Sequence, residues 1–95
     1  MSSYRLFILS LLVVVGCASV AQNTNKTGGD MAQLYVELGT ASLVRGEYSQ
    51  AITDLKKALE YDPKNTIAHN HLGLAYFGLE KKELAEIEFK EAVRI

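Results

Sequence analysis

Apolar residues recur every three or four positions from residue 31 to residue 95. This spacing gathers apolar side chains on one face of an α-helix, and no strand-like alternation competes with it. Two sites interrupt the pattern, because Gly46 can end a helix in the left-handed conformation and Pro63 disfavours helix at the residue before it. The pattern therefore predicts an all-α fold of four helices, near residues 31–45, 48–61, 66–79 and 82–95.

The segment before the first predicted helix has a different composition. Residues 17–30 are mostly small and polar, include two adjacent glycines and show no apolar period. Such a segment is typical of a flexible tether. Asp30 offers an N-cap for the first helix, with Gln33 three residues later to complete a capping box. We therefore expect a tether over residues 17–30 and a helical domain over residues 31–95.

The two predicted helix pairs repeat one another with a fixed period of about 34 residues, which divides the domain into units 32–65 and 66–95. Glycine and alanine recur where two helix backbones could approach closely, and larger residues recur where they could fill the space between pairs. The matched positions are Leu38 and Leu72, Gly39 and Gly73, Ala51 and Ala85, Leu55 and Phe89, Ala58 and Ala92, and Tyr35 and His69.

This period and these residue types resemble the tetratricopeptide repeat (TPR). The first unit supplies Tyr35, Leu38, Gly39, Gly46, Ala51, Leu55, Ala58 and Pro63, and the second supplies Leu72, Gly73, Tyr76, Ala85, Phe89 and Ala92. The resemblance implies a helix-turn-helix solenoid of two repeats, formed by four antiparallel helices. A generic bundle of helical hairpins is the alternative.

The chain departs from the repeat pattern in two places. Ser42 stands where an aromatic residue is usual, and we align Lys81 with Gly46. A non-glycine residue in the left-handed conformation costs about 1 kcal/mol, so we expect the second turn to be altered.

The number of repeats is also small. Two repeats are fewer than the three or so that independent stability usually requires, and no polar capping helix follows the second one. Either the chain is a fragment of a longer repeat protein or another chain covers its open end, and we favour the fragment.

The N-terminal residues predict export. Arg5 precedes an apolar run from Leu6 to Val15, which is shorter than the roughly 20 residues needed to span a bilayer. Residues 1–16 therefore suit a signal peptide, with an uncleaved anchor helix as the alternative. Gly16-Cys17 resembles a bacterial lipobox, which implies cleavage before Cys17 and lipid attachment to it. A disulfide is excluded, because the chain has no second cysteine.

Residue 18 and the net charge refine the location and the partners. An aspartate directly after the lipidated cysteine would resemble an inner-membrane retention signal, but this chain has Ala18 at that position. We therefore expect a lipid anchor in the outer membrane, with the protein facing the periplasm. Residues 17–95 hold nine Lys and Arg against eleven Asp and Glu, a formal net charge of −2. That charge balance favours neither binding to nucleic acid nor binding to anionic lipid through a polybasic patch. The acyl chains on Cys17 would provide the membrane contact.

No residue pattern predicts catalysis, a cofactor, a metal or a small-molecule substrate. His69 and His71 are two residues apart, so they point to different sides of a helix and cannot jointly bind a metal. His69 occupies the repeat's large-residue position and is expected to pack, whereas His71 is expected to be partly exposed. No serine, histidine and aspartate are ordered as a triad, and no glycine-rich phosphate loop is present.

The TPR resemblance implies a concave groove lined by the first helix of each pair. In the repeat register, the groove positions are Val36, Thr40, Leu43, Asn70, Leu74 and Phe77. Apolar residues around a polar centre suit an amphipathic or extended peptide. The groove positions include none of the Lys and Arg residues that would resemble a carboxylate clamp, so capture of a charged C-terminus is disfavoured. As the alternative, further repeats would cover Leu43, Leu74 and Phe77.

Two stretches within the repeats resemble one particular group of TPR proteins. Ala51-Ile52-x-Asp54-Leu55-x-Lys57-Ala58-Leu59 and Ala68-His69-Asn70-x-Leu72-Gly73-Leu74-Ala75-Tyr76 are similar to the type IV pilus biogenesis lipoproteins, the pilotins of the outer-membrane secretin. That resemblance implies that acyl chains carry the complex to the outer membrane while the groove holds a secretin subunit. A scaffold for another envelope machine, such as outer-membrane protein assembly or peptidoglycan enzymes, is the alternative.

Overall fold

The computed structural model describes residues 27–95, which form four α-helices and no strand. These helices are α2 (Gly28–Val44), α3 (Tyr48–Tyr61), α4 (Thr66–Gly78) and α5 (Lys82–Arg94). The predicted signal peptide, Cys17 and most of the predicted tether lie outside the described residues. The predicted all-α fold is confirmed, and α3 has the predicted bounds.

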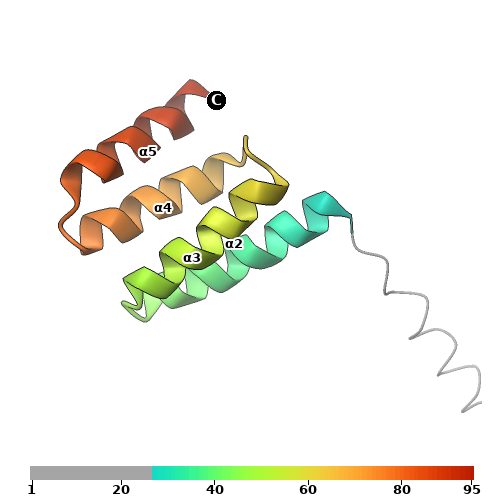
Figure 1. Ribbon diagram of the computed structural model, residues 1–95, viewed down its shortest axis with the longest axis horizontal. Coiled ribbons are helices and arrows are strands. Elements are labelled where there is room, and N and C mark those ends of the chain that lie inside the picture. Colours follow the sequence, from blue (N-terminus) through green and yellow to red (C-terminus); the bar gives the residue numbers. More distant parts are fainter. Residues whose placement is uncertain (1–26) are drawn as a thin grey trace, which may run out of the picture.

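The helices are arranged as two antiparallel pairs laid side by side (Figure 1). Helix α2 packs against α3, and α4 packs against α5. Helix α4 also contacts both α3 and α2, so it joins the second pair to the first. This order of contacts is the predicted helix-turn-helix solenoid of two repeats.

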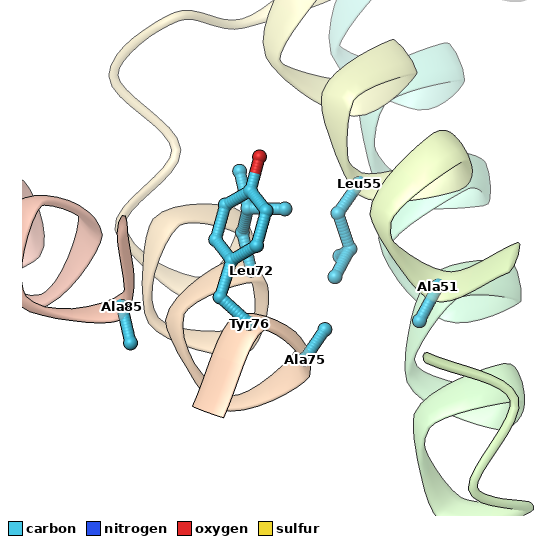
Figure 2. Close-up of a cluster of buried hydrophobic side chains, with 6 residues drawn as sticks. All are labelled: Ala51, Leu55, Leu72, Ala75, Tyr76 and Ala85. Carbon is cyan, nitrogen blue, oxygen red and sulfur yellow. The ribbon is translucent and has the colours of Figure 1, made fainter. Parts of the chain in front are cut away.

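The main core lies between α3 and α4 (Figure 2). Helix α3 contributes Ala51 and Leu55, and α4 contributes Leu72, Ala75 and Tyr76. Leu55 and Leu72 are the largest side chains that are completely buried. Burying one leucine side chain contributes about 1.5–3 kcal/mol, so these two hold much of the contact between the pairs.

Glycine allows the two helices of each pair to touch. A Cβ atom on Gly39 would lie 2.6 Å from Cγ of Leu55, and one on Gly73 would lie 2.6 Å from Cε1 of Phe89. Both contacts are far shorter than van der Waals distance. Because Gly39 and Leu55 each lie one repeat period before Gly73 and Phe89, the same close approach is built twice. The predicted role of these glycines is confirmed.

The first helix begins earlier than predicted, because Thr27 rather than Asp30 is its N-cap. The Thr27 hydroxyl oxygen accepts from the Asp30 backbone N–H at 3.3 Å, and the Asp30 carboxylate accepts from the Thr27 N–H at 3.1 Å. This reciprocal capping box satisfies two backbone donors, and it places an acidic residue in the first turn, where the helix dipole favours it. Gln33 instead donates to Glu37 at 3.2 Å.

The turns within the two pairs have the same backbone conformation. Gly46 has φ 74°, and Glu80, at the matching position of the second repeat, has φ 60°. The Glu47 N–H donates to Ser42 O at 2.9 Å in the first turn, and the Lys81 N–H donates to Tyr76 O at 2.9 Å in the second. The expectation of an altered turn at Lys81 was therefore wrong.

The counterpart of Gly46 is Glu80, and Lys81 caps α5 with φ −90°. The turn repeats its backbone bonds with a non-glycine residue in the left-handed conformation, at a cost of about 1 kcal/mol. The bond from the Lys81 N–H to Tyr76 satisfies a carbonyl at the end of α4, which helps to fix this conformation.

Replacing Gly39 with alanine should destabilise the domain. The added Cβ would lie 2.6 Å from Cγ of Leu55, which is completely buried and has no room to move away. Overpacking costs about 1–3 kcal/mol, which exceeds the roughly 0.5–1 kcal/mol that alanine gains over glycine in a helix interior. In a domain of this size, each kcal/mol lowers the melting temperature by roughly 4–8 °C. Gly28→Ala is the matched control, because a Cβ there has no neighbour within 4 Å. Thermal unfolding followed by circular dichroism measures the effect, and equal melting temperatures for the two variants would contradict the described packing.

Candidate protein-binding face

The residues predicted to line a groove lie on α2 and α4, the first helices of the two pairs, and one side-chain pair joins these two helices. The Thr40 hydroxyl donates to Val36 O at 2.7 Å, and its oxygen lies 2.9 Å from Nδ1 of His71. Because the hydroxyl hydrogen is committed to the carbonyl, Nδ1 of His71 is the donor to Thr40. Nε2 of His71 is then left as an acceptor when the ring is neutral.

The structure places the predicted residues at different depths. Asn70 and Leu74 are exposed on α4, and Thr40 is half-buried at the contact with His71. Leu43 is half-buried against the main core. Val36 is only 4% exposed, because it packs in a small cluster with Ala58 of α3 and Ala68 of α4. Val36 therefore supports this surface from below and does not offer its side chain to a partner.

Phe77 is exposed but is grouped with different residues. It lines an apolar hollow together with Ala85, Phe89 and Val93 of α5. All six predicted positions lie on α2 and α4, but Val36 is buried and Phe77 also faces the end of the solenoid formed by α4 and α5.

Sequence reasoning missed part of the α4 surface. Ile67 is 53% exposed, and His71 is half-buried beside Thr40. Ile67, Asn70, His71 and Leu74 follow the spacing i, i+3, i+4 and i+7, which puts them on one side of the helix. Ile67 lies one turn before Asn70 and His71 lies one turn before Leu74, so extending the helical period back from these two predicted positions would have found both residues.

We use the name α2–α4 face for the surface made by these helices. Its α2 edge is polar, since Gln33 and Glu37 occupy the positions that match Ile67 and His71 in the repeat register. Its α4 edge is more apolar. The members of the α2–α4 face are Gln33, Glu37, Thr40, Ile67, Asn70, His71 and Leu74.

His69 lies elsewhere and links three segments. Its Nδ1 is 2.7 Å from a carboxylate oxygen of Glu88 on α5, and its Nε2 is 2.9 Å from the carbonyl oxygen of Pro63 in the loop before α4. Both ring nitrogens face acceptors, so the charged ring, with two N–H groups, satisfies both contacts. The side chain is 11% exposed, consistent with the predicted packing role, but the ring also forms polar contacts that the sequence did not predict.

This setting raises the pKa of His69 above its ordinary value. Burial opposes the charge and is the largest single influence, but the hydrogen bonds to Glu88 and Pro63 outweigh it together with the charges of Glu88 and Glu91. The ring of His69 therefore connects α4, α5 and the preceding loop most strongly in its protonated form.

The described residues form no metal-binding cluster and no membrane span. Over residues 27–95, no three His, Cys, Asp or Glu side chains come together in a way that could hold a metal ion. None of the four described helices is long and apolar enough to cross a membrane.

Two family models match the chain and identify its class. One, described as TPR repeat, matches residues 32–79, and another, described as tetratricopeptide repeat, matches residues 67–95. The first model spans half of the chain. The chain therefore belongs to the tetratricopeptide-repeat family, whose stacked helix pairs serve as modules for binding proteins.

Among curated proteins, the chain is similar to the type IV pilus assembly protein PilF of Pseudomonas aeruginosa. The two are 37% identical over 95 aligned residues, which cover 94% of this chain and 38% of the relative. The chain thus spans about two fifths of that protein's length. No solved structure matches the chain.

The His69 contact predicts a pH-dependent contribution to stability. Because the pKa of His69 is raised in the folded state, the contribution is fully present below the pKa of an unfolded histidine, about 6.5, and is lost as pH rises through the folded value. Glu88→Gln should therefore lower the melting temperature more at pH 5.5 than at pH 8.5. Glu83→Gln, an exposed change on the same helix, controls for general charge. If Glu88→Gln lowered the melting temperature equally at both pH values, the contact between Glu88 and His69 would not stabilise the charged ring.

Proposed function

We propose that this chain is a lipid-anchored periplasmic assembly factor for type IV pili, a pilotin that aids the localisation and multimerisation of an outer-membrane secretin. The extent of the similarity to the pilus assembly protein is the main support. The two repeats, residues 32–95, make up about two thirds of the chain, whereas the similarity covers 94% of it. The likeness therefore extends into the N-terminal segment, which TPR proteins in general would not share.

The anchor in this proposal is Cys17. It follows the apolar run and Gly16, as in a lipobox. Each buried methylene of an acyl chain contributes about 0.8 kcal/mol, and one chain alone binds a membrane only reversibly. Two or three chains on Cys17 would keep the repeats at the periplasmic side of the outer membrane.

The α2–α4 face is the proposed contact with the secretin subunit. Ile67 and Leu74 supply exposed apolar surface on α4, and Asn70 between them can donate to and accept from a peptide backbone. This face contains no Lys or Arg, so a helix or an extended segment suits it better than a free carboxylate. The partner would be held without chemical change until it assembles.

Changing Cys17 to serine should abolish lipid attachment and outer-membrane residence. The repeats should remain folded, because the core described for them is formed by residues of the four described helices. Incorporation of labelled palmitate in the native host measures acylation, and fractionation of the envelope measures residence. Palmitate still entering the Cys17→Ser variant would disprove the lipid anchor.

Changing Leu74 to alanine should reduce secretin multimers while the protein stays folded and anchored. Truncating an interface hot spot costs about 2 kcal/mol or more, which corresponds to roughly 30-fold weaker binding. The assay compares multimeric and monomeric secretin in outer-membrane fractions, with Glu83→Ala as the exposed control. The melting temperature and abundance of each variant are measured alongside.

Two outcomes of this assay would contradict the proposal. Equal multimer levels in wild type, Leu74→Ala and the control would remove the α2–α4 face from the mechanism. Normal secretin assembly in a full deletion would remove the pilus role, and a scaffold for another envelope machine would take its place.

A further inference from the structure

The α2–α4 face holds a hydrogen-bond acceptor whose orientation is fixed across the contact between its two helices. The Thr40 hydroxyl donates to Val36 O at 2.7 Å, so its oxygen accepts from the Nδ1–H group of His71 at 2.9 Å. In the neutral ring the proton therefore stays on Nδ1, and Nε2 keeps its lone pair. Thr40 is a positioning residue, because it selects this tautomer of the His71 ring.

The Nε2 atom of His71 is open to solvent. His71 is half-buried, and its bond to Thr40 uses Nδ1. Within residues 27–95, every buried side-chain nitrogen or oxygen of a residue that is not exposed has a hydrogen-bond partner, but no described residue bonds to Nε2 of His71. Nε2 is therefore not among the buried atoms, and a donor from another molecule can reach it.

The charges of the four helices are divided between the inner and the outer helices. Every Lys and Arg within the helices lies on α3 or α5, and none lies on α2 or α4. The one charged member of the α2–α4 face is Glu37, which lies one turn before Thr40. Glu37 accepts from Gln33 at 3.2 Å and forms no ion pair within residues 27–95. This face therefore offers acceptors and a negative charge, with no cation to balance them.

Apolar side chains flank His71 along α4. Ile67 is 53% exposed and Leu74 is 43% exposed. They stand four residues before and three residues after His71, on the same side of the helix. Seven residues of α-helix separate two positions by about 10 Å. A segment bound on this face would therefore meet two apolar side chains with an acceptor between them.

We propose that the α2–α4 face selects a protein segment that carries an arginine or a lysine between two apolar side chains. The basic group donates to Nε2 of His71 in the field of Glu37, and the apolar side chains cover Ile67 and Leu74. An acidic side chain at the same place would face a carboxylate and a ring acceptor, and would lose its water without gaining a donor from either. The inference rests on the proposed binding of a secretin subunit at this face, and it adds the chemistry by which the segment is chosen.

Nuclear magnetic resonance of the ring nitrogens tests the orientation of His71. The full chain is labelled with ¹⁵N-histidine in mild detergent at pH 8, above the range in which histidine ordinarily takes up a proton. His71→Phe identifies the signals of His71. In the wild type, Nδ1 should give the signal of a protonated nitrogen and Nε2 that of a bare one. Thr40→Val removes the acceptor and should abolish this preference. A wild-type proton on Nε2 would overturn the proposal, because no ring acceptor would then face the partner.

A set of peptides tests the selection of a basic side chain. Each peptide has leucine at two positions seven residues apart, with arginine, norleucine or glutamate four residues after the first leucine. Shifts of the Asn70 and Leu74 amide signals in the same detergent measure binding to the full chain. The wild type should bind the arginine peptide about tenfold more tightly than the norleucine peptide, which is the effect of one hydrogen bond to a charged group. The glutamate peptide should bind most weakly.

Variants of the chain locate this preference. Glu37→Gln and His71→Phe should each reduce the preference for arginine over norleucine to about threefold or less. Glu83→Gln on α5, away from the α2–α4 face, should leave it unchanged. Any one peptide enters the detergent to the same extent with every variant, so the comparison between variants is unaffected by that loss. The proposal is overturned by equal affinity of the wild type for the three peptides, by a preference that both Glu37→Gln and His71→Phe retain in full, or by binding of none of them.

These results are distinct from the test of the proposed function. If secretin multimers depend on Leu74 but the arginine peptide is not preferred, the pilus role stands and the selection of a basic side chain is wrong. If the arginine peptide is preferred but Leu74→Ala leaves secretin multimers unchanged, the selection stands and the segment belongs to another protein.

Discussion

The packing of α4 against α3 is the contact on which the rest of the structure depends. Leu55 and Leu72 bury completely there, and Tyr76 closes the cluster at its edge. Without this contact, each helix pair would have only its own internal surface to bury, which is too little for a unit of about 30 residues. The contact also sets α4 beside α2, so the α2–α4 face exists only because the two pairs are stacked.

The repeat register explains which parts of the fold could be predicted. Small residues such as Gly39 and Gly73 encode close approach, and the effect is local enough to be seen in sequence spacing. The first residue of α2 is harder to predict, because Thr27-x-x-Asp30 and Asp30-x-x-Gln33 both fit a capping box. The second turn was misassigned by one position, although strict counting from Gly46 leads to Glu80.

The candidate site was less predictable because exposure depends on neighbours that are distant in sequence. Val36 has the spacing of a surface position, yet Ala68 of the second repeat packs with it and buries it. His69 bonds to Glu88 on the following helix, so its charge depends on a contact that no local pattern indicates. Phe77 matches Leu43 in register, but Leu43 packs against the core while Phe77 faces an open end. Position within the array, as well as position within the repeat, determines what a residue contacts.

Native-state hydrogen exchange tests most directly whether the stacked pairs form one cooperative unit. The amides of Leu55 on α3 and Leu72 on α4 lie on the two sides of the contact. If the α3–α4 packing holds the domain together, both amides should exchange with the same free energy of opening, equal to that of global unfolding. If the α2–α3 pair and the α4–α5 pair instead open with clearly different free energies, each pair is stable without the other, and the α3–α4 contact does not have the role assigned to it.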